Sequence, residues 1–335
     1  MTDYKKLNLI ATSSPHIRGS ETTRSIMLDV IIAMIPAVVF ACFNFGMRAL
    51  LLVGVSVIGA VFFEWLYRFL MKKPQSIGDL SAVVTGMLLA MTCPVTIGYW
   101  QILIGDFFAI IFVKQLFGGI GKNFINPALA GRAALVASYA GSMTKWIDPA
   151  ANKAAVLGSN VDVITAATPM AYLKEGNIAD LKAVYDVSDV FLGTIGGSLG
   201  EVSAIALILG GAYLIWRKVI NWQTPVAYIG TVAVLSFLFP KSGSGLEWML
   251  YSVFGGGLML GAIFMATDYA TSPATPVGQV IYGIGCGILT VLFRYYGLFP
   301  EGVTYAILIM NAFVWFIDRH TAMQRFGTKK GGAAK

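Results

Sequence analysis

Long apolar segments separated by short polar ones fill most of this sequence. Ten of them approach the roughly 20 mostly apolar residues that a helix needs to cross a membrane. The pattern predicts an all-α polytopic membrane protein of about ten transmembrane helices, whereas a β-barrel would give short alternating segments. The expected spans are residues 26–45, 48–70, 80–98, 100–117, 125–141, 200–219, 223–240, 247–267, 276–296 and 302–318.

Basic residues cluster at the ends of these segments and predict the orientation, because cytoplasmic loops carry an excess of Lys and Arg. With a cytoplasmic N-terminus, the cytoplasmic loops hold Arg68, Lys72, Lys73, Lys114, Lys122, Arg217 and Lys218, and the tail holds Arg319, Arg325, Lys329, Lys330 and Lys335. Both termini are therefore expected in the cytoplasm. The polar N-terminal segment has no apolar core, so we expect no cleavable signal peptide.

Five regions follow from this topology. They are a cytoplasmic segment (1–25), a first transmembrane repeat (26–141), a long extracytoplasmic loop (142–199), a second transmembrane repeat (200–318) and a cytoplasmic tail (319–335).

The composition supports a membrane protein. Hydrophobic residues make up 57 % of the chain and charged residues 12 %, against about 25 % charged residues in soluble domains. The mean hydropathy is +0.73. These values exclude a soluble enzyme, a disordered chain and a disulfide-rich secreted domain. The net charge of +7 is explained by the loop lysines and arginines, so we expect no nucleic-acid partner.

Two spans are expected to be broken. Cys93-Pro94 interrupts the uncharged run from Leu80 to Gly105, and a second run stops at Asp268, before a segment rich in Ser, Thr and Pro at 272–276. Broken helices at matching places in two halves are typical of transporters with an inverted repeat and a site between the halves.

The spacing of small and polar residues supports such a repeat. Gly86 and Thr92 are six residues apart, as are Gly261 and Thr267, and the two pairs are offset by 175 residues. Gln101-Gly105 and Gln279-Gly283 share a spacing of four and are offset by 178. Two inverted five-helix repeats are the interpretation that we test below. Chance recurrence of common residues is the alternative.

Charged residues within spans are costly and require a reason. Asp29 and Glu64 lie near span ends, where snorkelling or capping explains them. Asp106 lies deeper and either serves a cation path or pairs with Arg132. Asp268, next to Thr267 at the second break, either forms a cation site or flavin or quinone contact, or caps the break. The candidates for an ion or flavin path are therefore Asp268, Asp106 and Thr267.

Nothing in the sequence predicts a metal site. The three cysteines lie in or beside apolar stretches without a CxxC pair, and there are two histidines, so a disulfide, an iron–sulfur cluster or a haem site is not expected. These residues are Cys42, Cys93, Cys286, His16 and His320.

The outer loop contains Asp-Val-Ile-Thr-Ala-Ala-Thr-Pro-Met at 162–170. Composition alone describes this as a short apolar turn with two hydroxyl groups. Taken by itself, it gives Thr168 no special role, because neither a general base nor phosphate-binding glycines lie nearby in the sequence.

Several separate motifs, in order along nearly the whole chain, carry a resemblance to a known family. The motifs are SPHIR at 14–18, GGIGKN at 118–123, NPA at 126–128, GGSLGE at 196–201, ATD at 266–268, TPVGQ at 275–279, PEGV at 300–303 and MNA at 310–312. With these motifs the sequence resembles the D subunits of Rnf electron-transport complexes, relatives of the B subunits of sodium-pumping NADH:quinone reductases.

This resemblance implies that FMN is attached through its phosphate to Thr168. Asp162, Thr165 and Ala167 match the recognition sequence for that modification, while Ala166 stands where the family usually has glycine. Such a reaction requires a hydroxyl that a flavin transferase can reach, and an exposed loop provides one. The resemblance is also compatible with a second flavin that is bound non-covalently.

The resemblance further implies a role and a location. The chain is expected to relay electrons through FMN in a redox-driven pump that couples ferredoxin/NAD electron transfer to Na+ or H+ translocation. Its partners would be the other Rnf subunits in the bacterial cytoplasmic (inner) membrane. A secondary transporter or channel without a redox cofactor is the alternative class, and a membrane scaffold is a third; an unmodified Thr168 would favour either.

Overall fold

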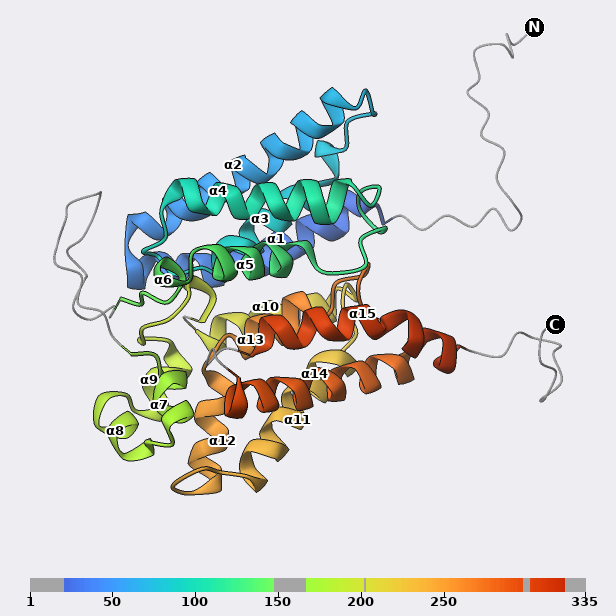
Figure 1. The fold of residues 1–335 in the computed structure, drawn as a ribbon. Helices are drawn as coiled ribbons and strands as arrows, with labels where there is room; N and C mark the ends of the chain where they lie inside the picture. The colour runs from blue at the N-terminus through green and yellow to red at the C-terminus, as the bar shows by residue number, and fades with distance from the viewer. Residues whose placement is uncertain (1–20, 148–166, 202, 298–301, 323–335) are drawn as a thin grey trace, which may run out of the picture.

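The computed structural model describes residues 21–147, 167–201, 203–297 and 302–322. The regular elements within these ranges are helices (Figure 1), so the expected all-α fold class is confirmed. The first half contains α1 (Thr23–Phe45), α2 (Met47–Leu70), η2 (Ile77–Asp79), α3 (Ser81–Met91), α4 (Tyr99–Phe107), the π-helical η3 (Phe108–Gln115), α5 (Pro127–Ser138) and α6 (Ala140–Met143).

The second half follows three short helices. These are α7 (Pro169–Glu175), α8 (Ile178–Val184) and α9 (Val187–Leu192). They are followed by η4 (Leu199–Glu201), α10 (Ala204–Trp216), α11 (Gln223–Leu238), α12 (Gly245–Phe254), α13 (Leu258–Leu260), the π-helical η5 (Gly261–Met265), α14 (Pro276–Tyr296) and α15 (Val303–Thr321).

The helices differ from the ten expected spans mainly in length. Within the described residues, α1, α2 and α14 are long and apolar enough to cross a membrane, and α12 with Leu258–Met265 would make a fourth span bent by 61°. The expected span at 80–98 forms a helix only as far as Met91. An 11-residue helix is about 16 Å long, roughly half of the hydrocarbon core. The count of ten spans therefore stays a prediction.

An arginine binds the unwound backbone at the expected break after Met91 and at a further break between Phe254 and Leu258. At the first, Arg48 Nε donates to the carbonyl of Val95 (2.9 Å). At the second, Arg294 Nη1 donates to the carbonyl of Ser252 (2.5 Å) and Nη2 to that of Gly255 (3.1 Å). Free carbonyls in an apolar interior are costly, so these arginines stabilise the breaks.

The break between Phe254 and Leu258 was not predicted from the sequence, which indicated only the break at Asp268 in this half of the chain. The helix stops at Phe254, and the chain turns through Gly256 (φ 67°) and Gly257 (φ 66°), a backbone region that side-chain-bearing residues rarely adopt. A second helical piece, Leu258–Met265, then precedes the unwound segment that starts near Asp268. The segment that was expected as one span at 247–267 is therefore interrupted once within its length, and the helix ends a second time just before Asp268.

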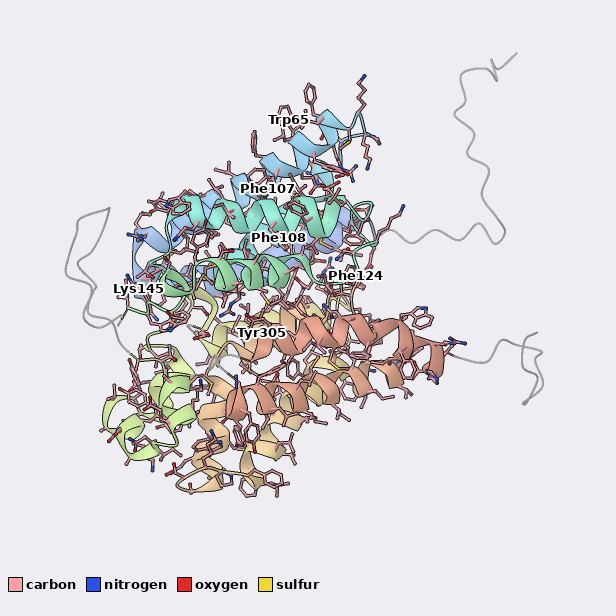
Figure 2. The ribbon with its side chains drawn as sticks, viewed as in Figure 1. Trp65, Phe107, Phe108, Phe124, Lys145 and Tyr305 are labelled. Carbon is pink, nitrogen blue, oxygen red and sulfur yellow. The ribbon has the colours of Figure 1, made fainter. Side chains whose placement is uncertain are left out.

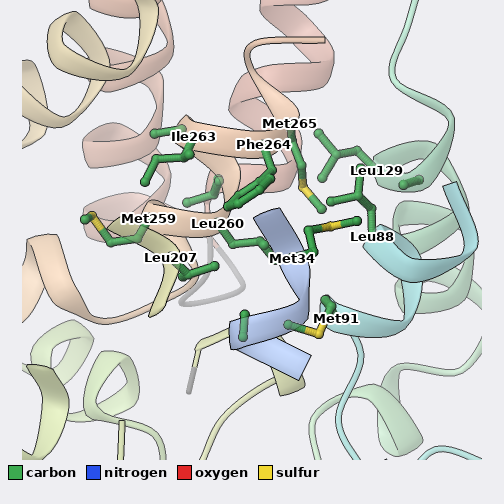
Figure 3. Close-up of a cluster of buried hydrophobic side chains, with 14 of the residues drawn as sticks. Met34, Leu88, Met91, Leu129, Leu207, Met259, Leu260, Ile263, Phe264 and Met265 are labelled. Atoms are coloured by element: carbon green, nitrogen blue, oxygen red, sulfur yellow. The ribbon is translucent and has the colours of Figure 1, made fainter. Parts of the chain in front are cut away.

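The two short half-helices, α3 and Leu258–Met265, belong to one apolar core between the halves of the molecule. Figure 3 shows Leu88 and Met91 facing Leu260, Phe264 and Met265 across this core. Gly200 lies in between: a Cβ there would be 2.8 Å from the Met91 carbonyl and 2.5 Å from the Leu260 side chain. Because no larger residue fits without displacement, Gly200 allows the half-helices to approach closely.

The paired positions of the proposed repeat do not have equivalent neighbours. Gly86 packs against the α2 backbone at Ser56, whereas Gly261 packs against Val303 of α15. Gln101 Oε1 accepts from the Gly98 amide, whereas Gln279 Nε2 donates to the Pro273 carbonyl. The inverted repeat therefore remains a prediction.

The first and last described helices have their outer ends on the same side of the bundle (Figure 1), and the cytoplasmic location of both termini stays a prediction. The start of α1 and the end of α15 lie at one end of the bundle, and α7, α8 and α9 lie at the other (Figure 1). The 142–199 segment, expected as a loop, is helical over much of its described part. These short helices pack on α12 through buried Met170, Leu181, Trp248 and Tyr251.

The outer surface of the helices is apolar. Phe43 is 76 % exposed and Ile58 71 %, and Trp65 projects away from the bundle on α2 (Figure 2). In water such a surface would drive association, but in a bilayer it contacts lipid. Three apolar helices of spanning length and this surface indicate a membrane protein.

Candidate functional site

Thr168, the expected flavin acceptor, is the N-cap residue of α7. Its Oγ1 accepts a hydrogen bond from the amide of Ala171 (3.3 Å), and Pro169 follows at the first helical position. Thr168 is 2 % exposed, so the expectation of an exposed hydroxyl is wrong for this state of the chain. Ala167 is exposed, whereas Asp162, Thr165 and Ala166 lie outside the described residues.

Thr168 is buried at the start of α7, a helix that packs against α12 and α14. A small pocket beside α7 is lined by Met170, Trp248 and Arg294 and encloses about 210 Å³. This is less than the roughly 300–1,000 Å³ of ordinary ligand pockets. Thr168 therefore has the hydroxyl oxygen that an FMN phosphoester needs, but with α7 packed as it is here neither this hydroxyl nor the pocket leaves space for the flavin ring.

A larger cavity, which we call the central cavity, lies between the two halves. The space between its walls is about 730 Å³, including the part that opens to solvent. Its walls come from α1, α3, η3 and the start of α5 in the first half, and from α10, η5 and the segment after η5 in the second. The polar residues that line it are Ser81, Thr85, Lys114, Asn123, Asn126, Thr267, Asp268 and Tyr269.

Two of the three predicted path residues lie at this cavity. Thr267 Oγ1 donates to the carbonyl of Ile263 (2.6 Å), and Asp268 Oδ2 accepts from the Thr271 hydroxyl (3.1 Å). Asp268 thus lines the central cavity and also orders the turn that follows it. Both interpretations from the sequence, a site residue and a cap, agree with this geometry.

Asn126 joins the two halves beside the same cavity. Its Oδ1 accepts from the Ala128 amide (3.0 Å) and caps α5, while its Nδ2 donates to the carbonyl of Met265 at the end of η5 (3.3 Å). A short polar residue at an N-cap is expected before the Pro127 that begins the helix. Here the same side chain also satisfies a carbonyl of the broken element.

A buried ion pair at the cavity was missed from the sequence. Lys114 Nζ lies 2.6 Å from Glu64 Oε2 and donates to Ser81 Oγ (2.7 Å), and Glu64 also accepts from Ser76. Lys114 is 3 % exposed and Glu64 0 %. The placement of Lys114 in a loop and of Glu64 at a snorkelling position was therefore wrong. The one available signal was that Lys114 ends an uncharged apolar run.

Asp106 lies apart from the central cavity, fully buried against α2. Its Oδ1 is 2.9 Å from Ser56 Oγ, which also lies 2.8 Å from the Gly86 carbonyl. Asp106 contacts Ser56 rather than Arg132, so the pairing considered from the sequence is wrong. A hydroxyl has one hydrogen, so a neutral Asp106 carboxyl satisfies both contacts.

Asp29 joins the two halves instead of snorkelling. It accepts from Tyr213 OH (2.8 Å) and pairs with Arg217 (3.2 Å), both near the end of α10. Because Arg217 is half exposed, the pair contributes little to stability.

Thr168 and the central cavity lie at opposite ends of the bundle. Figure 2 shows Lys145 at the end where α7 packs and Phe124, close to the cavity residues Asn123 and Asn126, at the other. The structure therefore brings Asp268 and Thr267 together but keeps them apart from Thr168. A single site containing all of the candidates is excluded.

Comparison with known sequences gives a match over almost the whole chain. Residues 10–327 match the family described as NQR2, RnfD, RnfE. The D subunit of a Na+-translocating ferredoxin:NAD+ oxidoreductase complex from Acetobacterium woodii is 45 % identical over 97 % of both chains. The D subunit of a proton-translocating ferredoxin:NAD+ oxidoreductase complex from Clostridium ljungdahlii is 43 % identical, covering 97 % of this chain and 98 % of its own. The D subunit of an ion-translocating oxidoreductase complex from Actinobacillus succinogenes is 35 % identical over 92 % of this chain and 95 % of its own.

Proposed function

The chain belongs to the NQR2, RnfD, RnfE family, and we propose from this membership that it is the D subunit of an ion-translocating ferredoxin:NAD+ oxidoreductase. The single observation that carries the proposal is the similarity to named D subunits over almost the full length of both chains. One of these relatives is named for Na+ and another for H+, so similarity does not choose the ion. The proposed location is the bacterial cytoplasmic membrane.

The proposed role within the complex is electron relay through FMN bound covalently to Thr168. The Asp162, Thr165, Ala167 and Thr168 pattern supports it, as does the position of Thr168 at the start of a short helix outside the core. A bound flavin accepts and donates electrons, while the protein positions the ring and tunes its potential. Because Thr168 is buried, we propose that a flavin transferase acts before α7 packs.

The central cavity is the proposed place for a second, non-covalent flavin. Its walls combine apolar side chains such as Leu88 and Phe264 with the amides of Asn123 and Asn126. A flavin ring has apolar faces and a hydrogen-bonding edge, so such a lining is complementary to it. Asn123 and Asn126 would orient the edge, and the apolar residues would exclude water.

The test of this function uses the intact complex. Gentle detergent extraction with a tagged chain should recover membrane and peripheral partners that carry flavin and iron–sulfur centres. Vesicles from the wild type should couple ferredoxin-dependent NAD+ reduction to ion uptake, and vesicles without this chain should do neither. A chain that transports a solute alone, with no redox partner, would instead support a secondary transporter.

The proposed topology has ten spans with both termini in the cytoplasm. In a cysteine-free background, Glu175→Cys, at the exposed end of α7, should react with an impermeant maleimide added outside intact cells. Lys72→Cys, exposed after α2, should react only after the membrane is opened. The opposite pattern would invert the topology.

Asp268 is proposed to act in transport or flavin contact in addition to ordering its turn. Asp268→Asn preserves shape and an oxygen for Thr271, so we expect coupled ion uptake to fall about tenfold or more with the melting temperature nearly unchanged. Thr271→Val is the matched control, because it removes the same hydrogen bond and keeps the carboxylate. If Asp268→Asn lowers stability but not uptake, Asp268 only caps the break.

A further inference from the structure

We propose that Lys114 is the anion-binding residue of the central cavity and that Glu64 holds it in position. This inference rests on the proposal that the central cavity binds a flavin. It adds the residue that would favour negative charge on the occupant, and thus a determinant of its reduction potential.

The hydrogen bonds of Lys114 leave one donor for the cavity. An ammonium group has three hydrogens, and among the described residues its partners are Glu64 Oε2 at 2.6 Å and Ser81 Oγ at 2.7 Å. Ser81 Oγ itself donates to Asp79 Oδ1 (2.5 Å), so it accepts from Lys114. Lys114 and Ser81 both line the central cavity. The third hydrogen is therefore available to an occupant.

Glu64 acts as a saturated counter-ion. One carboxylate oxygen accepts from Lys114 and the other from the Ser76 hydroxyl, with Arg68 Nε at 3.9 Å. Glu64 is completely buried and does not line the cavity. It therefore keeps Lys114 charged in an apolar region, where an unpaired ammonium would be costly, while leaving the cavity side of the ammonium uncovered.

The backbone places Lys114 at this position. It belongs to the π-helical η3, whose wider turn departs from the α-helical α4 that precedes it. π-Helical segments are rare and frequently lie at functional sites. The Gly119 amide donates to the Lys114 carbonyl (2.9 Å), so the chain turns directly after this residue. The lysine is thus directed inward at the end of an apolar run.

The central cavity has one cationic and one anionic wall. Lys114 comes from the first half, and Asp268 comes from the second. A reduced flavin carries its negative charge along one edge of the ring, and Coulomb attraction in an apolar cavity is much stronger than in water. The arrangement favours an occupant whose negative edge faces Lys114 and the first half.

Three variants of the purified complex test this assignment. Glu64→Gln removes the counter-ion, the double variant Glu64→Gln/Lys114→Met removes the pair without leaving a buried unpaired charge, and Lys122→Met removes an exposed lysine that does not line the cavity. The readouts are the content of extractable flavin, its potential by spectroscopic redox titration, and the melting temperature.

We expect both Glu64→Gln and the double variant to have a lower reduction potential than the wild type, because Lys114 loses its charge in the first and its ammonium group in the second. The double variant should bind reduced flavin about tenfold more weakly than wild type relative to the oxidised form, which is a decrease of about 59 mV for a one-electron couple. Lys122→Met should leave the potential unchanged.

The outcomes separate the two proposals. If the wild-type complex contains no extractable flavin and binds none when flavin is added, the proposed second flavin fails. If flavin is present but the double variant keeps the wild-type potential, Lys114 is not its anion-binding residue. An equal shift of the reduction potential in Lys122→Met would also overturn the assignment, because the potential would then depend on the general positive charge at this end of the bundle and not on Lys114.

Discussion

Replacing Thr168 with valine is expected to eliminate the flavin fluorescence of the denatured polypeptide on a gel. Valine keeps the shape of threonine but lacks the oxygen to which the phosphate would be attached. It also lacks the N-cap acceptor for the Ala171 amide, a loss of about 1 kcal/mol, so the fold should survive. The measurement is in-gel fluorescence, together with the mass of the Thr168 peptide, after co-expression with a flavin transferase.

Two controls separate chemistry from folding in this experiment. Thr168→Ser keeps both the hydroxyl and the cap, so it should retain a modified peptide. Thr165→Val should weaken modification without abolishing it, because that hydroxyl belongs only to the recognition sequence. Full fluorescence in Thr168→Val, or an unmodified wild-type peptide, would refute the assignment and favour a transporter.

The second large effect is expected where the two halves meet, in Gly210→Val. A Cβ at Gly210 of α10 would be 2.3 Å from the Ala33 carbonyl of α1 and 3.0 Å from the Phe264 ring. Helices in membranes pack closely through such small residues. Because the α1 backbone cannot move without disturbing the core in Figure 3, we expect a loss of about 1–3 kcal/mol or more. Thermal unfolding in detergent measures this loss.

Gly230→Val is the matched control. Gly230 lies within α11 and is exposed, and a Cβ added there would meet no described atom within 4 Å. Both substitutions change helix propensity equally, so the difference between them reports the contact between α10 and α1. Equal melting temperatures for the two variants would show that the halves do not depend on this close approach.

The sequence alone determined the fold class, the family and the existence of two broken helices. Spanning helices can be recognised locally in a sequence, because a helix that crosses the hydrocarbon core needs about 20 consecutive, mostly apolar residues. Pro94 likewise indicates its break locally, because proline lacks the amide hydrogen that a helix needs. The motif at 162–168 indicated Thr168 only through resemblance to a family, since its composition is that of an ordinary turn.

The additional break before Leu258 and the positions of the charged side chains were decided by tertiary structure. The break falls at Gly256 and Gly257, where Arg294 of α14 binds the freed carbonyls. That arginine follows the break by nearly 40 residues, which no local pattern contains.

Tertiary structure also decided which groups form a site. Lys114 and Glu64 are separated by 50 residues, and each alone resembles a charge near the end of a span. Only the packing of η3 against α2 and α3 buries both and directs the lysine to the cavity shared with Asp268. Sequence patterns specify helices because backbone hydrogen bonding is local. The meeting of charges from distant helices depends on how those helices pack, and that was available only from the folded chain.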